Sequence, residues 1–508
     1  MKQDKLAASM PGKEDGIRGD RRAKHAPETD VDVPVCIDLD GTLIRSDMLW
    51  ESAIQMWRRP LLAVRAAFVL LLRGKASMKT MLAEVPQINV ATLPYRPELL
   101  AYLEAQKAMG RPLVMATATH KGLADRIAAH LGIFSRVFAT DGDMNLSGNC
   151  KRDALVSAYG SRGFDYIGDH SKDLPIFAEA RHALLVNPSP SLLSRASTAG
   201  NVHKVFRERP PFAKVLARTL RLHQWAKNVL LGVPLVAAHL ITDSEAWARL
   251  CVAFLAFGLV ASATYIFNDL IDLESDRQHG RKRHRPLPAG DISIPRAISL
   301  MVATAGAGIA ISLALPALFL QYLALYVVLT LAYSLVLKSR LIVDVLVLSI
   351  LYTLRILAGG TAVGAAVSEW LLMFSLFLFL SLAFLKRSVE LMGHRSALLV
   401  PGRGYAAIDI ESIKTMGMAS GLLSVLVFAQ YIGGTTVAQL YRQPQLLWLE
   451  VPLLVYWITR IWFMAARGEV QHDPVVFALR DGKSYIIGAC SLLIGLLATS
   501  GLDRWLGN

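Results

Sequence analysis

The feature that most constrains the fold of this chain is a succession of long apolar segments between residues 226 and 503. A helix needs about 20 mostly apolar residues to cross a bilayer, and by that measure there are about nine such segments. The first is short, and we expect it to be tilted or partly interfacial. The segments lie near residues 227–241, 248–268, 294–313, 317–336, 342–364, 369–386, 412–433, 446–464 and 484–503. We therefore expect an all-α, multi-pass membrane domain over residues 211–508.

Basic residues divide the loops of this domain into two sets. Clusters such as Lys338 with Arg340 follow the second, fourth, sixth and eighth segments, whereas the alternate loops contain one basic residue between them, Arg442. Because loops rich in Lys and Arg stay in the cytoplasm, we expect a cytoplasmic (inner) membrane protein whose C-terminus lies outside. The same rule explains the net charge of +14. We expect no nucleic-acid partner.

The chain before residue 211 reads as a soluble region. Residues 1–31 are polar and charged and lack the apolar core of a signal peptide, so we expect a disordered tail and a cytoplasmic N-terminal domain. Residues 32–210 are typical of an α/β, Rossmann-like domain. The four cysteines have no CxxC or CxxH spacing, which predicts free thiols instead of a zinc site or disulfides.

Acidic residues follow two predicted strands of the soluble domain. The strand at 33–37 leads into Asp38 and Asp40, and the strand at 164–168 leads into a second acidic pair. That pair is Asp169 and Asp173. Sites of α/β sheets lie at the carboxyl ends of their strands, so these carboxylates are expected to converge.

Two further residues complete a recognisable pattern. Thr117 ends a predicted strand at 111–117, and Lys151 opens an amphipathic helix. Over residues 34–190 the pattern resembles the haloacid dehalogenase-like (HAD) phosphotransferase superfamily. The resemblance implies that Asp38 is the nucleophile, that Asp40 is the general acid/base, and that Thr117 and Lys151 hold phosphoryl oxygens. It also implies a Mg²⁺ site formed by Asp38, Asp40, Asp169 and Asp173. A cation is needed because the nucleophile and the substrate are both anionic.

A helical insertion follows the first aspartates, at about residues 47–93, where this superfamily often has a cap. Its apolar stretch 61–72 is too short to span a bilayer and is interrupted by Arg65. The stretch is either a packed cap helix or an interfacial helix on the membrane.

The end of the second apolar segment carries an acidic motif, Asn268-Asp-Leu-Ile-Asp-Leu-Glu-Ser-Asp276. Asp269, Asp272 and Asp276 are spaced i, i+3, i+7, so a helix aligns them in one stripe. Three bare carboxylates on one stripe repel one another, and Mg²⁺ bridging to a phosphate is the expected remedy.

This motif, followed by Arg283-His-Arg-Pro286 and Gly290, resembles the UbiA superfamily of intramembrane prenyltransferases, over essentially all of residues 215–508. The resemblance implies that Asp269, Asp272 and Asp276 bind a diphosphate with Mg²⁺, with Asp269 and Asp272 directly catalytic. The superfamily has a second acidic motif after the sixth span. Here that loop, Phe384-Leu-Lys-Arg-Ser-Val-Glu390, has one carboxylate and two cations.

This difference from the superfamily's second acidic motif resembles one branch of the superfamily, the decaprenyl-phosphate phosphoribosyltransferases. The segments at 222–228, 333–338, 355–360 and 473–481 are similar to that branch. The branch implies a phosphorylated sugar donor, phosphoribosyl diphosphate, and a polyprenyl phosphate acceptor. The expected substrate-binding residues are Lys227, Asn228, Asn268, Arg285, Tyr333, Lys338, Asp344, Arg355, Lys386, Arg387 and Glu390.

The expected reaction transfers 5-phosphoribose to polyprenyl phosphate and releases diphosphate. The HAD domain then removes the 5-phosphate of the product, on a route to cell-envelope glycans. Two alternatives stay open. The membrane domain is an ordinary prenyltransferase that uses an aromatic or other acceptor, or the HAD domain is a scaffold without catalysis. Lipid chain length, the exact sugar, the HAD substrate and the oligomeric state are not readable from the residues.

Overall fold

The computed structural model describes residues 30–57, 88–141, 145–199, 201–393, 404–434, 437, 440–470, 474–478 and 480–500. Most of the expected tail, and the apolar stretch 61–72 of the expected cap, lie outside these residues. The chain divides into two compact units. The first contains residues 1–38, 97–140 and 146–206, and the second contains 39–96, 141–145 and 207–508. Residues 39–57 and 88–96 therefore belong with the membrane helices, although the sequence assigns them to the soluble domain.

The first unit is built on a six-stranded parallel sheet with the strand order β3-β2-β1-β4-β5-β6. The chain moves outward from β1 to β3 and then crosses back to β4, which makes a doubly wound topology. The strands are β1 (Val35–Ile37), β2 (Leu113–His120), β3 (Arg136–Thr140), β4 (Asp165–Gly168), β5 (Ala183–Val186) and β6 (Val202–Phe206). The expected α/β fold is confirmed.

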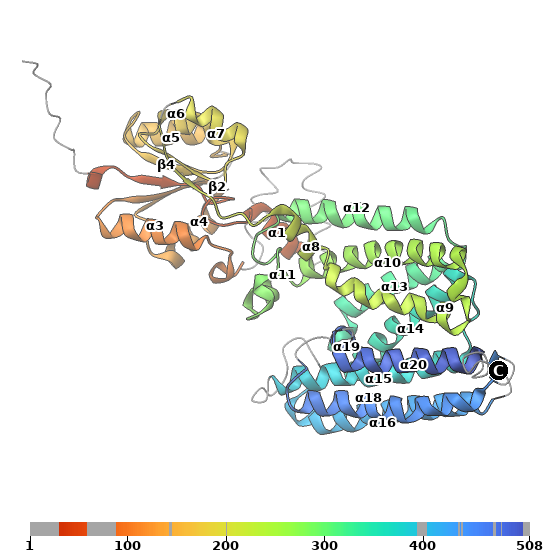
Figure 1. The fold of residues 1–508 in the computed structure, drawn as a ribbon. Coiled ribbons are helices and arrows are strands. Elements are labelled where there is room, and N and C mark those ends of the chain that lie inside the picture. The colour runs from red at the N-terminus through yellow and green to blue at the C-terminus, as the bar shows by residue number, and fades with distance from the viewer. Residues whose placement is uncertain are drawn as a thin grey trace, which may run out of the picture. The chain divides into compact units, whose positions relative to one another are not determined.

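Helices cover both faces of this sheet, as Figure 1 shows. Helices α3 (Pro97–Ala108) and α4 (Lys121–Leu131) lie on one face. Helices α5 (Asn149–Tyr159), α6 (Leu174–Glu179) and α7 (Pro190–Ser197) lie on the other. Strands covered on both faces are mostly apolar, and β1, β4 and β5 are buried at every position, including Asp165 of β4, which pairs with Arg111 and Arg181.

The membrane part of the second unit contains, in the described residues, eight helices long and apolar enough to cross a bilayer. The chain is therefore an integral membrane protein. The helices are α10 (Ser244–Ile271), α12 (Ile294–Ser312), α13 (Ala317–Leu335), α14 (Val343–Val363), α15 (Glu369–Met392), α16 (Ile410–Ile432), α18 (Glu450–Ala466) and α20 (Gly482–Ser500). Figure 1 shows them side by side in a bundle.

The first expected span, near 227–241, is not one long helix. It consists of the 3₁₀ helix η4 (Leu222–Gly232), the short helix α9 (Val233–Ala237) and η5 (Leu240–Thr242). Pro234 has no N–H to donate, so the helix restarts at Val233 instead of running through. The segment packs against α10 and α14. At Gly359 of α14 a Cβ would lie 2.1 Å from the Leu231 carbonyl oxygen, so only glycine allows this approach.

Two apolar clusters form the core of the bundle. One joins α10, α13 and α14 around side chains such as Phe257 and Tyr326. The other joins α14 to α15, α16 and α18 around side chains such as Tyr352 and Trp462. Helix α14 contributes to both clusters and has the most buried window of the eight spans. Polar side chains on α14 therefore lie inside protein and not against lipid.

Candidate active sites

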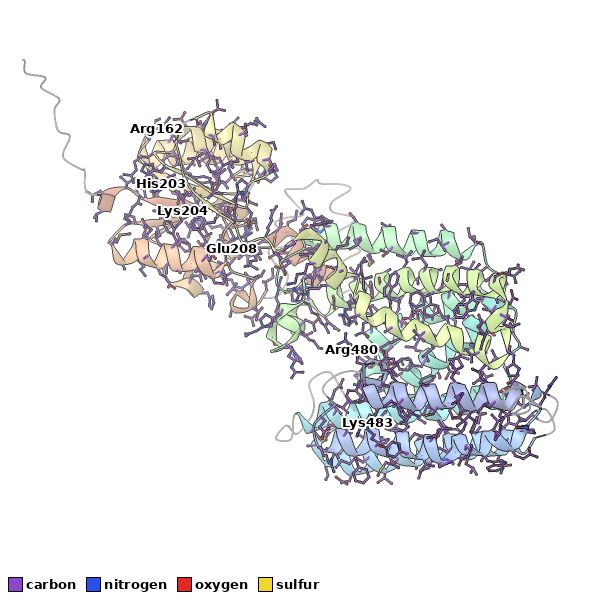
Figure 2. All side chains as sticks on the ribbon, viewed as in Figure 1. Arg162, His203, Lys204, Glu208, Arg480 and Lys483 are labelled. Atoms are coloured by element: carbon purple, nitrogen blue, oxygen red, sulfur yellow. The ribbon has the colours of Figure 1, made fainter. Side chains whose placement is uncertain are left out.

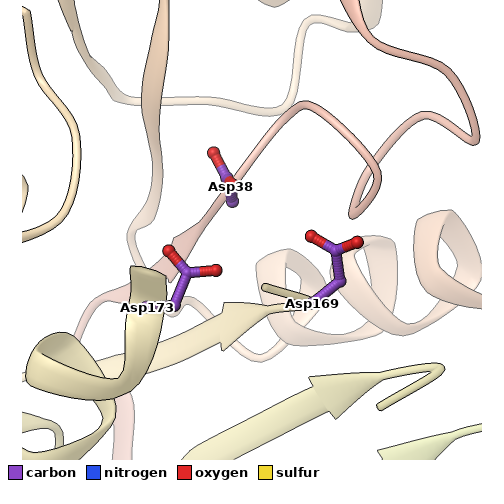
Figure 3. Close-up of side chains that lie close together, drawn as sticks. All are labelled: Asp38, Asp169 and Asp173. Carbon is purple, nitrogen blue, oxygen red and sulfur yellow. The ribbon is translucent and has the colours of Figure 1, made fainter. Parts of the chain in front are cut away.

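Three carboxylates converge at the carboxyl edge of the sheet, as Figure 3 shows. Asp38 follows β1, Asp169 follows the neighbouring strand β4, and Asp173 ends the short 3₁₀ helix Ser171–Asp173. One oxygen from each lies within 4.8 Å of the other two. The strand order reverses between β1 and β4, which is the position where α/β sheets commonly bind their ligands.

The electrostatics of this cluster favour a bound cation. Burial, and then the negative charge of Asp38, raise the pKa of Asp173 to about 6. Lys151 Nζ lies 2.8 Å from Asp38 Oδ1 and 3.8 Å from Asp173 Oδ1, so one ammonium group faces two buried carboxylates. A set of carboxylate oxygens around an undercompensated negative charge fits Mg²⁺, which prefers oxygen ligands.

The remaining residues expected here are placed as follows. Thr117 is fully buried in β2, next to β1, and its Oγ1 accepts a hydrogen bond from the Thr119 N–H at 3.0 Å. Lys151 lies in the first turn of α5. Asp40 belongs to the second unit, where its Oδ1 accepts from the Met48 N–H at 2.8 Å. The structure thus brings together Asp38, Asp169, Asp173 and Lys151.

Sequence reasoning missed Tyr166, a buried residue of β4. Its hydroxyl donates to Asp173 Oδ1 at 3.1 Å and accepts from Lys151 Nζ at 3.2 Å. The available signal was a hydroxyl inside an apolar strand, two residues before Gly168, because alternation puts positions 166 and 168 on one face. A Cβ at Gly168 would lie 2.8 Å from Asp173 Oδ2, so this position has room only for glycine.

Replacing Tyr166 with phenylalanine is expected to weaken Mg²⁺ binding by about 10-fold, because outer groups that orient a metal ligand contribute on that scale. The Tyr166 hydrogen bond also lowers the pKa of Asp173, so its loss raises that pKa further. Calorimetric titration with Mg²⁺ measures the effect. Tyr159→Phe is the control, because Tyr159 packs edge-on against Phe138 with ring centres 6.2 Å apart. Equal Mg²⁺ affinities in the two variants would contradict this role.

A second acidic site lies where α10 ends. Asp269 is in the last turn of α10, Asp272 caps it, and Asp276 is in α11 (Leu273–Gln278). Arg285 Nη1 lies 3.1 Å from Asp269 Oδ1 and 2.6 Å from Asp276 Oδ2, and Arg221 also pairs with Asp269. One guanidinium reaches both carboxylates, so Asp269 and Asp276 face the same side, although the single helix that the spacing predicts is divided into α10 and α11.

These carboxylates are not the bare stripe that the sequence suggests. Lys338 Nζ lies 2.8 Å from Asp272 Oδ1, and Lys282 Nζ lies 3.4 Å from Asp276 Oδ1. Each aspartate therefore has at least one basic partner, supplied by a distant or intervening loop. The alternation of acids and bases fits a Mg²⁺–diphosphate complex, whose metal would bind the carboxylates and whose oxygens would take the bases.

The side chains of a third polar cluster, around Arg387, hydrogen-bond to one another. Arg387 Nε donates to Asp344 Oδ2 at 2.5 Å, and both side chains are almost fully buried. Arg387 also donates to the Tyr333 hydroxyl at 2.7 Å and pairs with Glu390. Tyr405, which sequence reasoning missed, donates to Asp344 Oδ1 at 2.5 Å. Because Asp344 and Arg387 satisfy each other, their contacts fit a structural role better than the substrate contact predicted from the sequence.

A different arrangement surrounds Arg355 of α14, which is 3% exposed. In the described part of the chain its guanidinium has only neutral partners, and it lies over three aromatic rings. The hydrogen-bond acceptors are Asn228 Oδ1 at 3.3 Å, the Leu351 carbonyl at 2.7 Å and the Tyr326 hydroxyl at 3.2 Å. A buried cation without a counter-ion is costly, so this position favours an anion.

Two neighbours of Arg355 strengthen that interpretation. Lys227 Nζ lies 5.4 Å from the centre of the Tyr352 ring, on which Arg355 also stacks. Asn228 is 2% exposed, and its Nδ2 has no hydrogen-bond partner among the described residues. A buried donor without an acceptor calls for a ligand or a water.

Of the other expected residues, Asn268 and Lys386 are half-buried on α10 and α15. Asp473, the first residue of the segment 473–481 that resembles the phosphoribosyltransferases, lies outside the described residues.

Two family models match the chain. Residues 35–178, which include the Asp38 cluster, match the model of the haloacid dehalogenase-like hydrolases. Residues 229–481, which include the Asp269 site, match the model of the UbiA prenyltransferase family.

Several proteins are similar in sequence. An uncharacterized protein, y4nM of Sinorhizobium fredii, is 37% identical over 90% of this chain and 89% of its own length. The nodulation protein NoeC of Azorhizobium caulinodans is 33% identical over 54% of this chain and 90% of its own length. The decaprenyl-phosphate phosphoribosyltransferase of Corynebacterium glutamicum is 36% identical over 37% of this chain, which spans 58% of that enzyme.

Proposed function

Since the chain belongs to the UbiA prenyltransferase family through its membrane domain and carries a haloacid dehalogenase-like domain before it, we propose a Mg²⁺-dependent phosphoribosyl transfer to a polyprenyl phosphate. An oxygen of the lipid phosphate bonds to C1 of phosphoribosyl diphosphate as the C1–diphosphate bond breaks. Diphosphate leaves, and the lipid gains 5-phosphoribose. The similarity to decaprenyl-phosphate phosphoribosyltransferases supports this choice of donor.

The aspartates at the end of α10 receive the donor in this proposal. Asp269, Asp272 and Asp276 would hold Mg²⁺, which supplies charge stabilisation to the departing diphosphate. Arg285 and Lys338 exchange their carboxylate partners for diphosphate oxygens when the donor binds. Asn268, one turn before Asp272, completes this face. Lys386 lies on helix α15, where the superfamily has its second acidic motif, and a cation there suits a substrate with more than one phosphate group.

The observation that carries the proposal is the buried Arg355 with neutral partners. Together with Lys227 and the unpaired Asn228 amide it forms a cationic site walled by aromatic rings. We assign this site to the phosphate of the lipid acceptor, because an apolar wall accepts a prenyl chain beside the charged head. A transferase that only moved a prenyl group to an aromatic acceptor would have no use for a second anion site.

The soluble domain acts on the product in this proposal. Asp38 attacks the phosphorus of the 5-phosphate, the ester oxygen leaves with a proton from Asp40, and water then hydrolyses the aspartyl phosphate. Lys151 and Thr117 hold phosphoryl oxygens. Asp38, Asp169 and Asp173 would hold Mg²⁺, which would screen the nucleophile and the phosphate from each other. Both sites face the cytoplasm, where the loops rich in Lys and Arg and the soluble domain are expected.

A transfer assay on the detergent-purified protein tests the proposal. Phosphoribosyl diphosphate labelled in the ribose is incubated with polyprenyl phosphate and Mg²⁺, and the lipid fraction is analysed. We expect labelled lipid whose 5-phosphate is removed by the same protein. The assignment is wrong if no labelled lipid forms while a prenyl diphosphate is consumed with an aromatic acceptor. The scaffold alternative gains if the lipid forms but keeps its phosphate.

Replacing Arg355 with methionine separates the roles of the two anion sites. We expect the KM for polyprenyl phosphate to rise by about 10-fold or more, because a charged hydrogen bond to phosphate is lost. The KM for the donor should stay unchanged. Thermal stability should stay equal or rise, since the buried charge is removed. Arg340→Met on an exposed loop is the control. A rise in the donor KM instead would assign Arg355 to the donor.

A further inference from the structure

Part of the expected soluble domain is built into the membrane unit, beside the transferase aspartates. Helix α1 (Met48–Trp57) places Ile54 in an apolar cluster with Ile266 and Leu270 of α10 and with Leu273 of α11. Trp50 packs on the same cluster, which also includes Leu287. Apolar side chains that pack tightly hold a helix in a fixed place. Helix α1 is thus packed against the segment that carries Asp269, Asp272 and Asp276.

An ion pair between Glu51 of α1 and Arg277 of α11 also holds α1 next to the acidic site. Arg277 donates to Glu51 through two parallel bonds, Nη2 to Oε1 at 2.6 Å and Nη1 to Oε2 at 3.0 Å. The two side chains are 7% and 6% exposed. A buried bidentate pair fixes both position and orientation of the guanidinium. Arg277 directly follows Asp276, so the pair lies at the transferase motif itself.

Arg277 in turn holds the loop that carries Arg285. Its third donor, Nε, bonds to the Pro288 carbonyl oxygen at 3.2 Å. Within that loop the Ala289 N–H bonds to the Arg285 carbonyl at 3.0 Å, which closes a turn between the two points. Arg285 then reaches Asp269 and Asp276 from this turn. The contacts therefore run without interruption from Glu51 to the two carboxylates.

A second anchor holds the other end of the same loop. Arg45 lies 3.4 Å from Asp291 and 3.1 Å from Glu208, which is labelled in Figure 2. Arg96 also pairs with Glu208, at 3.3 Å, and donates to the Gly41 and Thr42 carbonyls. Gly290 has φ +72°, and a Cβ there would lie 2.5 Å from the Arg45 Cβ. The loop and the chain around Arg45 thus fit against each other with no room for a side chain.

We propose that Glu51 and Arg45, from the segment that follows Asp38 in the chain, are positioning residues of the transferase. They fix the loop 279–291, so that Arg285 is already held beside Asp269 and Asp276 before the donor binds and the diphosphate site is preformed. The soluble part of the sequence thereby completes the transferase site, besides any chemistry of its own. The inference rests on the proposed function only in that the aspartate site binds a diphosphate.

Binding of inorganic diphosphate with Mg²⁺ to the full-length protein tests this directly, by calorimetric titration. Glu51→Gln is expected to weaken binding by about 10-fold, the scale found when a group that orients a ligand is lost. Glu104→Gln, at an exposed position of α3, is the control and should bind like the wild type. In the transfer assay the donor KM should rise in Glu51→Gln, while kcat and the lipid KM stay unchanged.

The pathway through Arg277 gives a second check. If Glu51 acts by holding Arg277, then Glu51→Gln combined with Arg277→Gln binds diphosphate no more weakly than Arg277→Gln alone. Arg45→Gln, at a partly exposed side chain, repeats the test without altering the buried pair and is expected to weaken binding in the same direction.

Two results would overturn the inference. One is wild-type diphosphate affinity in both Glu51→Gln and Arg45→Gln. The other is a loss confined to melting temperature or to kcat, which marks a purely structural role. Diphosphate is common to phosphoribosyl and prenyl donors, so the binding result stands even if the proposed donor is wrong. Conversely, a working transfer reaction with unaffected variants would reject only the positioning role.

Discussion

Asp38→Asn is expected to reduce phosphatase turnover by about 10⁴-fold or more, the scale of losing a nucleophile in a covalent mechanism. Asparagine keeps the size of the side chain, but it cannot attack phosphorus. The pKa of Asp173 should fall, because the charge of Asp38 is the second cause that raises it. In the coupled reaction, labelled lipid should therefore accumulate with its 5-phosphate intact. Mass spectrometry of the lipid fraction and hydrolysis of a simple phosphomonoester measure the two effects.

The control for this prediction is Asp153→Asn, an exposed aspartate on α5 that pairs with its neighbour Arg152. It should leave both activities unchanged. The rate of ribosyl transfer should also be unchanged in Asp38→Asn, since the transfer chemistry belongs to the other site. If Asp38→Asn retained phosphatase turnover near that of Asp153→Asn, then the carboxylate cluster would not be the hydrolytic centre.

Asp269→Asn is expected to slow transfer by about 10²- to 10³-fold, the loss seen when one group that stabilises developing charge is removed. Asp269 is buried at the end of α10, where it balances Arg221 and Arg285. Without its charge, both arginines remain to attract diphosphate, so residual diphosphate binding should depend less on Mg²⁺. Initial rates at several Mg²⁺ concentrations, with diphosphate titrations alongside, measure both consequences.

Glu245→Gln provides the matched control, because Glu245 lies on the exposed first turn of the same helix and pairs only with Arg249 among the described residues. Hydrolysis by the soluble domain should be equal in both variants. A normal transfer rate in Asp269→Asn, or an unchanged dependence on Mg²⁺, would remove the acidic motif from the mechanism.

The convergence of Asp38, Asp169 and Asp173 could be predicted because it depends on local pattern and general topology. Short apolar strands followed by acids place those acids at the carboxyl edge of a parallel sheet, whatever the details of packing. The membrane spans were predictable for a similar reason, since length and apolar character alone decide whether a helix can cross a bilayer. The sequence also predicted that Asp269 and Asp276 share one side, although they lie on two successive helices, α10 and α11, and not on one.

The partners of these residues were decided only by the tertiary structure. Strand alternation puts Tyr166 on the same face as Gly168, but only the fold places its hydroxyl between Lys151 and Asp173. The contact of Tyr405 with Asp344 likewise depends on the fold. The same holds for the pairing of Glu51 with Arg277, two residues 226 positions apart.

The sequence by itself thus determined the two fold classes, and it predicted which acids lie at the two candidate sites. The tertiary structure decided that Arg387 pairs with Asp344 and Glu390, whereas Arg355 has only neutral partners among the described residues. It also decided that residues 39–57 join the membrane unit. The physical reason is the distance along the sequence over which each effect acts. Helical and strand periodicity act over a few residues, whereas charge pairing in a packed interior depends on which distant side chains the fold brings within hydrogen-bond reach.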